Sequence, residues 1–308
     1  GNYPVNEIGQ KQYPRYEFFK QIEAVFRDDG KTAPVFNDKH LSWKFEWARE
    51  MVDVSRELNF PYLAGSSLPV TWRMPSLEMP YGVEIEEAMA VGYGGLEAYG
   101  FHTLETLQCM IERRKGGETG VATVQAVSGD ALVKARNAGR WSQELLEAAL
   151  GSLPSKLRTK QAIGPAAEKN ATAYLMEHRD GLKSSVVMAN GFNNQFCFAA
   201  KLKGRKEPVA VWFRLEEGKP FGHFEHLLRA IEEMFHTGQP AFPVERTLMT
   251  TGLTDAMMRA AVHPGRSLET PELHFAYKPR SFKALRENGA SWKIITDAMP
   301  EPRGIDNS

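Results

Sequence analysis

The stretch TAPVFNDKHLSW, residues 32–43, decides the fold of this chain because a short apolar strand runs there directly into a helix. Val35 and Phe36 favour extended backbone, and four polar residues follow them. Ser42 is of a type that caps helix N-termini by accepting a hydrogen bond from a free backbone N–H. Ligands of open α/β sheets bind just beyond the carboxyl ends of strands, so we expect the chemistry of the chain in the polar turn at 37–40.

Lys39 and His40 are the candidates for proton transfer in this turn. A lysine transfers protons near neutral pH only when burial or a neighbouring cation lowers its pKa, whereas a histidine needs no such help. The alternative is that Asp38 and Lys39 are ordinary solvated residues of a loop.

Helices and strands alternate on both sides of the turn. Apolar residues at helical spacing predict helices over 16–26 and 43–58, and the apolar residues 62–65 predict a second buried strand. This alternation is typical of a parallel sheet.

From about residue 69 the pattern changes to a series of strands at short intervals, which predicts an antiparallel sheet. The strands are expected over 84–91, 121–127, 172–177, 184–189, 195–202 and 208–215, with an edge strand over 273–277. Helical spacing recurs over 101–113, 224–235 and 247–262.

The sequence therefore predicts an α/β plus α+β chain. Residues 1–68 form a parallel βα segment, and residues 69–278 form a domain with a large, mainly antiparallel sheet covered by helices. Residues 279–308 are expected to be a polar tail, and the polar connection at 156–169 is long enough to be a flap.

Charge and composition argue against several classes of partner. The chain of 308 residues carries 38 basic and 38 acidic side chains, so neither nucleic acid nor an anionic membrane is indicated. No apolar run approaches the roughly 20 residues that span a bilayer. The 2 cysteines rule out a disulfide scaffold and a cysteine-based zinc site. No signal segment is visible at the start, and we expect a cytoplasmic location.

A second polar cluster occupies residues 100–105, where a helix is predicted to begin. His102 lies at the helix opening, and Glu105 follows three residues later on the same face, so an oriented imidazole is expected. The alternative is that His102 caps the helix or fills a core position with its hydrogen bonds satisfied.

Arg73 directly follows Trp72 at the change of pattern. An arginine beside a tryptophan at this crossover is suited to holding a sugar or a carboxylate. A stacked, purely structural arginine explains the pair equally well.

Other motifs give weaker signals. His223 and His226 have a spacing that can share a metal, but no Glu-x-x-His partner helix is visible, so no metal site is predicted. Ser66 and Ser67 lack the Gly-x-Ser-x-Gly turn of a hydrolase. No glycine cluster has the Gly-x-Gly-x-x-Gly spacing that a dinucleotide needs.

The order of these features resembles the Gfo/Idh/MocA family of oxidoreductases, from about residue 33 to 277. Residues 38–40 look like the family's Glu-Lys-Pro turn, with histidine in place of proline, and residues 100–105 are similar to its Gly-x-His-x-x-Asp helix start. Residues 238–240 and the helix after them resemble its closing segment. Ala98 stands where the family usually has an aspartate. The stretches at 13–19 and 65–73 resemble an uncharacterised bacterial branch of the family more closely.

The resemblance implies a Rossmann-like nucleotide-binding domain, of which residues 1–68 are the C-terminal half, with the pyrophosphate-binding unit lying before Gly1. It implies NAD or NADP as cofactor, bound incompletely by this chain, near Asp38, Lys39 and His40. Lys39 would polarise or deprotonate the reacting hydroxyl, and His102 would be its acid/base partner. Glu105 or Glu97 would orient the imidazole. The substrate-binding residues would be Arg73, Trp72, Tyr99 and Glu97.

The function implied by the resemblance is that of an NAD(P)-dependent oxidoreductase acting on a sugar, polyol or glycoside hydroxyl. The rival is a non-catalytic sugar-binding or oligomerisation module of the same fold, which Ala98 and the missing phosphate turn favour. The family's exposed sheet face often mediates pairing, so we expect a homo-oligomer formed through that face.

Overall fold

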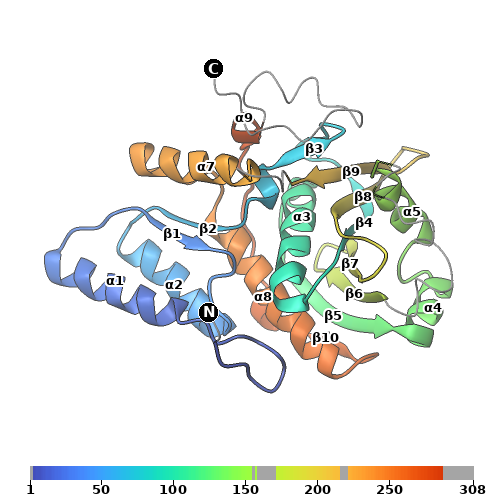
Figure 1. Ribbon diagram of the computed structural model, residues 1–308, viewed down its shortest axis with the longest axis horizontal. Coiled ribbons are helices and arrows are strands. Elements are labelled where there is room, and N and C mark those ends of the chain that lie inside the picture. Colours follow the sequence, from blue (N-terminus) through green and yellow to red (C-terminus); the bar gives the residue numbers. More distant parts are fainter. Residues whose placement is uncertain (1–2, 155–156, 158–170, 216–220, 287–308) are drawn as a thin grey trace.

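The computed structural model describes residues 3–154, 157, 171–215 and 221–286. Its first part is a short parallel sheet of β1 (Val35–Asp38) and β2 (Tyr62–Gly65), flanked by α1 (Arg15–Asp29) and α2 (Phe45–Glu57) (Figure 1). Asp38 pairs with Gly65, so both strands end at the same edge. The helix–strand alternation predicted from the sequence is confirmed here.

The second helix begins two residues later than the sequence predicts. Lys44, rather than Ser42, occupies the N-cap position of α2. The hydroxyl of Ser42 accepts a hydrogen bond from the backbone N–H of Lys44 at 3.3 Å, so it caps the turn that precedes the helix and not the helix itself.

The second part is an eight-stranded sheet with the order β10-β5-β6-β7-β4-β8-β9-β3. Only β4 and β7 pair in parallel, and every other neighbouring pair is antiparallel. The strands are β3 (Trp72–Met74), β4 (Ile85–Gly92), β5 (Val121–Ser128), β6 (Ala171–His178), β7 (Lys183–Ala189), β8 (Phe196–Leu202), β9 (Val209–Arg214) and β10 (Ser267–Glu269). The large, mainly antiparallel sheet expected from the sequence is therefore confirmed.

Helices cover both faces of this sheet (Figure 1). On one face lie α3 (Phe101–Ile111) and α8 (Val244–Val262), and on the other lie α4 (Gly129–Asn137) and α5 (Gln143–Gly151). Alternate residues of β4 divide between the two hydrophobic clusters, because side chains of a strand point to opposite faces. The sequence analysis did not predict α4 and α5. They cover the sheet face opposite α3 and α8.

The helix α8 joins the two sheets. It is buried along nearly its whole length and contacts α2 and β2 as well as α3 and β5. Gly252 permits this approach, because a Cβ added there would lie 2.7 Å from the ring of Phe45 in α2. Buried residues of both parts consequently form one continuous hydrophobic cluster.

The expected edge strand at 273–277 is absent from the structure. The edge is β10 instead, and a 3₁₀ turn at Pro271–Leu273 follows it. Pro271 cannot donate to a strand ladder, and Thr270 closes the sheet edge by bonding to the backbone of β5. Of the segment, Tyr277 alone forms an isolated bridge, to Glu118.

Two more helices complete the described chain, α7 (His223–Thr237) and the short α9 (Lys283–Arg286). The expected flap at 156–169, apart from residue 157, and the tail beyond residue 286 lie outside the described residues. None of the described helices combines the length and the apolar character that crossing a membrane requires.

Candidate functional site

A pocket of about 560 Å³ lies beyond the carboxyl ends of β1 and β2, where ligands of α/β sheets bind. Its walls come from these strand ends, the start of α3, the start of β8 and the start of α7. The lining residues are Asp38, Lys39, Ser66, Ser67, Leu68, Tyr93, Ala98, Tyr99, His102, Phe196, Leu215, Phe221, His223, Phe224 and Leu227. Polar groups thus gather at the strand ends, and aromatic rings face them.

Lys39 lies in this pocket with an unusual backbone. Its φ is 66°, in the left-handed region that residues with a side chain rarely adopt. The Lys39 N–H donates to the carbonyl of Gly65 at 2.9 Å, which fixes the turn to the end of β2. The ammonium group donates to Asp38 at 2.6 Å. Strained residues concentrate at functional sites, so this geometry marks Lys39 as a functional candidate.

His102 lines the same pocket from the first turn of α3. Burial, supported by the charges of Lys39 and His223 and opposed by Asp38, lowers the pKa of His102 to about 4. The imidazole is therefore neutral at neutral pH. Its Nδ1 is buried and has no hydrogen-bond partner among the described residues.

His40 does not line the pocket, although it directly follows Lys39. Its side chain is 3% exposed, and its Nε2 accepts a hydrogen bond from Arg15 at 3.1 Å. Burial, and then the charge of Arg15, hold the pKa of His40 well below its usual value. The neutral ring packs between Tyr13 and Phe101 and supports the turn from behind.

Glu105 is fully buried and is directed away from His102. One carboxylate oxygen accepts from the backbone N–H of Ser66 at 3.2 Å, and the other accepts from the hydroxyl of Thr250 at 3.0 Å. Burial raises the pKa of Glu105. This carboxyl group thus positions the pocket wall at Ser66 and makes no contact with the imidazole it was expected to orient.

The π-helical turn at Leu96–Gly100 separates two predicted substrate-binding residues. Tyr99 lines the pocket, and its ring lies edge-on to His102 with the centroids 6.0 Å apart. Glu97 points the other way, is 8% exposed and accepts from the backbone N–H of Lys11 at 2.6 Å.

Arg73 and Trp72 lie in β3, outside the pocket lining. The Arg73 side chain is fully buried, forms an ion pair with Glu78 at 3.1 Å and stacks over Phe213. Trp72 is buried against His226. These contacts agree with the alternative given for this pair, in which the arginine is stacked and purely structural.

The structure adds pocket residues that the sequence analysis set aside. Ser66 and Ser67 were discounted for lacking a hydrolase motif, and His223 was considered only for a metal pair with His226. His226 instead contacts the carbonyl of Leu285, and no metal-binding group of three or more side chains exists among the described residues. The position of both serines directly after a strand, beside the first strand's turn, was the signal that could have identified them.

The segment of residues 3–14, which we call the N-terminal strap, braces the pocket from outside. Besides the bond from Lys11 to Glu97, the amide of Gln10 donates to Asp255 of α8 at 2.7 Å. The strap, which leads into α1, is thus bonded to the π-helical turn before α3 and to the central helix α8.

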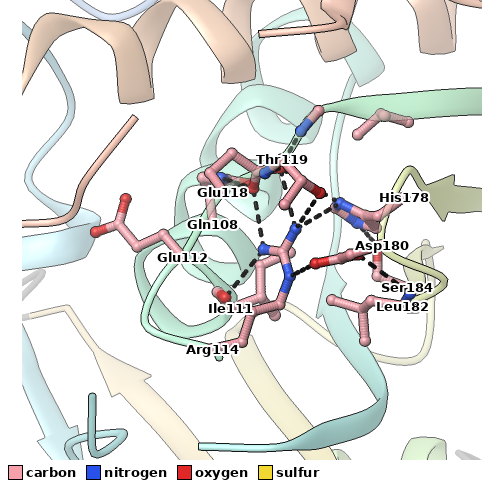
Figure 2. A network of polar contacts seen from close by, with 12 residues as sticks. Gln108, Ile111, Glu112, Arg114, Glu118, Thr119, His178, Asp180, Leu182 and Ser184 are labelled. Carbon is pink, nitrogen blue, oxygen red and sulfur yellow. Dashed lines mark hydrogen bonds and ion pairs between the residues drawn. The ribbon is translucent and has the colours of Figure 1, made fainter. Parts of the chain in front are cut away.

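Another polar cluster, distinct from residues 100–105 and outside the pocket lining, has a structural role (Figure 2). Arg114 bonds to both Glu118 and Asp180, at 3.2 and 2.7 Å, and His178 bonds to Ser184 at 2.8 Å. The His178 ring and the Arg114 guanidinium hold the pKa of Glu118 well below its usual value, against the effect of burial. The groups satisfy one another in the interior, which accounts for their burial.

No protein-family model matches the sequence, and no curated protein matches it. Solved structures do match. Apo scyllo-inositol dehydrogenase from Lactobacillus casei has 13% identity and a TM-score of 0.50, over 83% of this chain and 77% of that chain. GenD2 from gentamicin A biosynthesis, in complex with NAD, has 14% identity and a TM-score of 0.49, over 85% and 76%. A putative myo-inositol dehydrogenase from Sinorhizobium meliloti 1021 has 11% and 0.49, over 83% and 78%. The chain therefore shares the fold of this scyllo-inositol dehydrogenase, which agrees with the fold expected from the resemblance to Gfo/Idh/MocA oxidoreductases.

Proposed function

We propose that this chain forms the catalytic side of an NAD(P)-dependent oxidoreductase that acts on a hydroxyl of a sugar, polyol or glycoside. The observation that carries the proposal is the convergence of Lys39 and His102, from β1 and α3, on one pocket at the carboxyl ends of parallel strands. The fold it shares with a scyllo-inositol dehydrogenase, a protein also solved with NAD(H) and scyllo-inositol, supports the same reaction class.

The described residues fit only the reactive end of a dinucleotide. Asp38, Lys39, Ser66 and Ser67 offer polar groups at the strand ends, and the Nδ1 of His102 is buried without a partner among the described residues. The sequence contains no glycine turn of the spacing that holds a pyrophosphate. These residues would therefore hold the nicotinamide and its ribose beside the substrate.

A bound dinucleotide would accept a hydride from the carbon that carries the reacting hydroxyl. The Lys39 ammonium would donate a hydrogen bond to the hydroxyl oxygen and stabilise the charge that develops there. His102, neutral because its pKa is low, would take up the hydroxyl proton. Tyr93, Tyr99 and Phe196 would pack against the sugar ring and exclude water.

The test is NADH or NADPH formation with scyllo-inositol, other polyols and simple glycosides as substrates. We expect Lys39→Ala to lower turnover by about 100-fold or more, because it removes both the charge and the hydrogen bond at the reacting oxygen. Lys31→Ala, an exposed lysine outside the pocket, is the matched control. Undiminished turnover in Lys39→Ala would remove the central claim.

A non-catalytic sugar-binding module is the second candidate. It is favoured by Ala98, a residue that cannot ionise, and by the direction of Glu97 and Glu105 away from the pocket. Calorimetric titration separates the two candidates. Binding of scyllo-inositol by both the parent chain and Lys39→Ala, with no dinucleotide-linked turnover by either, would favour the module.

A further inference from the structure

His223, which the sequence analysis considered only for a metal pair with His226, lies in the pocket. It is the first residue of α7, its side chain is 8% exposed, and its ring packs on Phe224 with the centroids 4.2 Å apart. It lines the same cavity as Lys39 and His102. Three proton-carrying side chains, distant in sequence, therefore surround one volume.

The two imidazoles interact electrostatically. The charge of His223 lowers the pKa of His102, in the same direction as burial and the charge of Lys39. Two interacting titratable groups disfavour the doubly charged state, so a proton on His223 favours the neutral form of His102. One charged and one neutral imidazole is the arrangement that a paired acid and base require.

Among the described lining residues, no carboxylate is available to act as the acid or the base in place of the two histidines. Asp38 is the one acidic residue there, and it is paired with Lys39 at 2.6 Å. Position 98, one turn before His102, is an alanine. Glu97 and Glu105 are engaged behind the wall with the backbone of Lys11 and Ser66.

We propose that His223 is a second proton-transfer residue of this pocket, acting opposite His102, and that the pair enolises a bound keto sugar without a dinucleotide. The proposal rests on the proposed function only in taking the pocket as the site of a sugar or polyol ring. The ammonium of Lys39 would hold the ketone oxygen in place.

The step consumes no oxidant or reductant. Neutral His102 takes the proton from the carbon beside the carbonyl, and that C–H electron pair forms a C=C bond. The C=O π pair moves to oxygen, which takes the proton of protonated His223. An enediol results, with the proton exchanged between the two rings. Reversal in D₂O, after the rings exchange with solvent, leaves deuterium on the carbon.

The experiment uses the ketone obtained by oxidising one hydroxyl of scyllo-inositol, incubated in D₂O with the full chain and no dinucleotide. Proton NMR follows the loss of the signal at the carbons beside the carbonyl. We expect exchange clearly faster than in buffer alone, and at least tenfold slower exchange in His223→Gln, which keeps a hydrogen-bonding group and loses the titratable ring. His236→Gln is the matched control, because His236 is exposed at the far end of the same helix.

Two further measurements make every outcome decisive. Thermal unfolding and calorimetric binding of the same ketone confirm that His223→Gln is folded and still binds. A folded, binding His223→Gln that exchanges as fast as the parent chain would overturn the proposal, and so would a parent chain that does not exceed buffer. Dinucleotide-linked oxidation without exchange would overturn this inference alone. Exchange without such oxidation, in the presence of NAD and NADP, would overturn the proposed function alone.

Discussion

At the scale of single residues, the site depends on one strained backbone position. Lys39 holds a left-handed φ of 66°, and its N–H bond to Gly65 keeps it there. That conformation costs about 1 kcal/mol for a residue with a Cβ and much less for glycine. A residue retained against this cost has a side chain whose position matters, which is the argument for its role in catalysis.

We expect Lys39→Gly to be more stable than Lys39→Ala by about 1 kcal/mol, because both lose the side chain and only glycine relieves the strain. Chemical denaturation of the two variants, analysed with a common slope, measures the difference. Equal stabilities would show that the turn relaxes when the lysine is removed.

The pKa of His102 makes stability depend on pH. The pKa is about 4 in the folded chain, below the ordinary histidine value of 6.5 that applies to the unfolded chain. Between these values the unfolded chain binds a proton that the folded chain does not, so the free energy of unfolding falls as the pH drops from 6.5 towards 4. The full loss from this group is about 3 kcal/mol.

Replacing His102 by glutamine should therefore flatten the pH dependence of the free energy of unfolding over this interval. His40, whose pKa is also lowered, chiefly by burial and Arg15, contributes a slope of the same sign in both proteins. Urea denaturation at several pH values provides the measurement. Parallel pH curves for the parent and His102→Gln would contradict the burial of a neutral imidazole.

The sequence identifies some of these residues and misplaces others for a physical reason. Lys39 and His102 were predicted because each lies at an element boundary that the local pattern reveals, Lys39 after β1 and His102 at the opening of α3. The directions of Arg73, Glu97 and Glu105 depend on partners such as Phe213, Lys11 and Thr250, which the fold brings in from elsewhere. Local spacing holds no information on those contacts, so proximity to a motif was not enough to place a side chain in the pocket.

At the scale of elements, the long strands were predictable, whereas the short edge strand β10 and two helices were not. Alternating residues in β5 and the apolar runs of β7 and β8 mark strands clearly. The helices α4 and α5 are nine residues each and lie between Gly129, Gly139 and Gly151, so neither presents a long periodic face. Their formation depends on packing against the sheet, where Trp141 and Leu145 are buried.

Leu145→Ala should lower the free energy of unfolding by about 2–4 kcal/mol, because it leaves a cavity between α5 and the sheet. The exposed Glu147, half a turn further along the helix, is the control, and Glu147→Ala should change the free energy by about 0.5 kcal/mol or less. Thermal and urea unfolding test both variants. A small effect of Leu145→Ala would mean that α5 does not cover the sheet face in solution.

At the scale of the whole molecule, the two sheets share one core. The hydrophobic cluster continues from Leu63 of β2 through α8 to Val211 of β9. The sequence predicted two structural units from the change of pattern near residue 69, and it could not show that one helix near the C-terminus would join them. That joining is a long-range contact between segments that are far apart in the chain.

We expect the chain to unfold in a single cooperative transition, since neither sheet can lose its core without exposing that of the other. Leu63→Ala and Val211→Ala should each lower the temperature of this single transition. Near-UV and far-UV circular dichroism during heating provide the measurement. Two separate transitions, each shifted by only one of the substitutions, would show independent units.

Proteolysis of the N-terminal strap can report whether a ligand occupies the pocket. Its bonds to Glu97 and Asp255 join an outer segment of chain to the wall that carries Tyr99 and His102. A protease can cut the strap only when those bonds open, and a ligand that steadies the wall makes opening rarer. The rate of cleavage within residues 3–14 should therefore fall when a ligand fills the pocket. Candidate sugars can be ranked by how slowly the gel band of the intact chain disappears during proteolysis, before any reaction has been found.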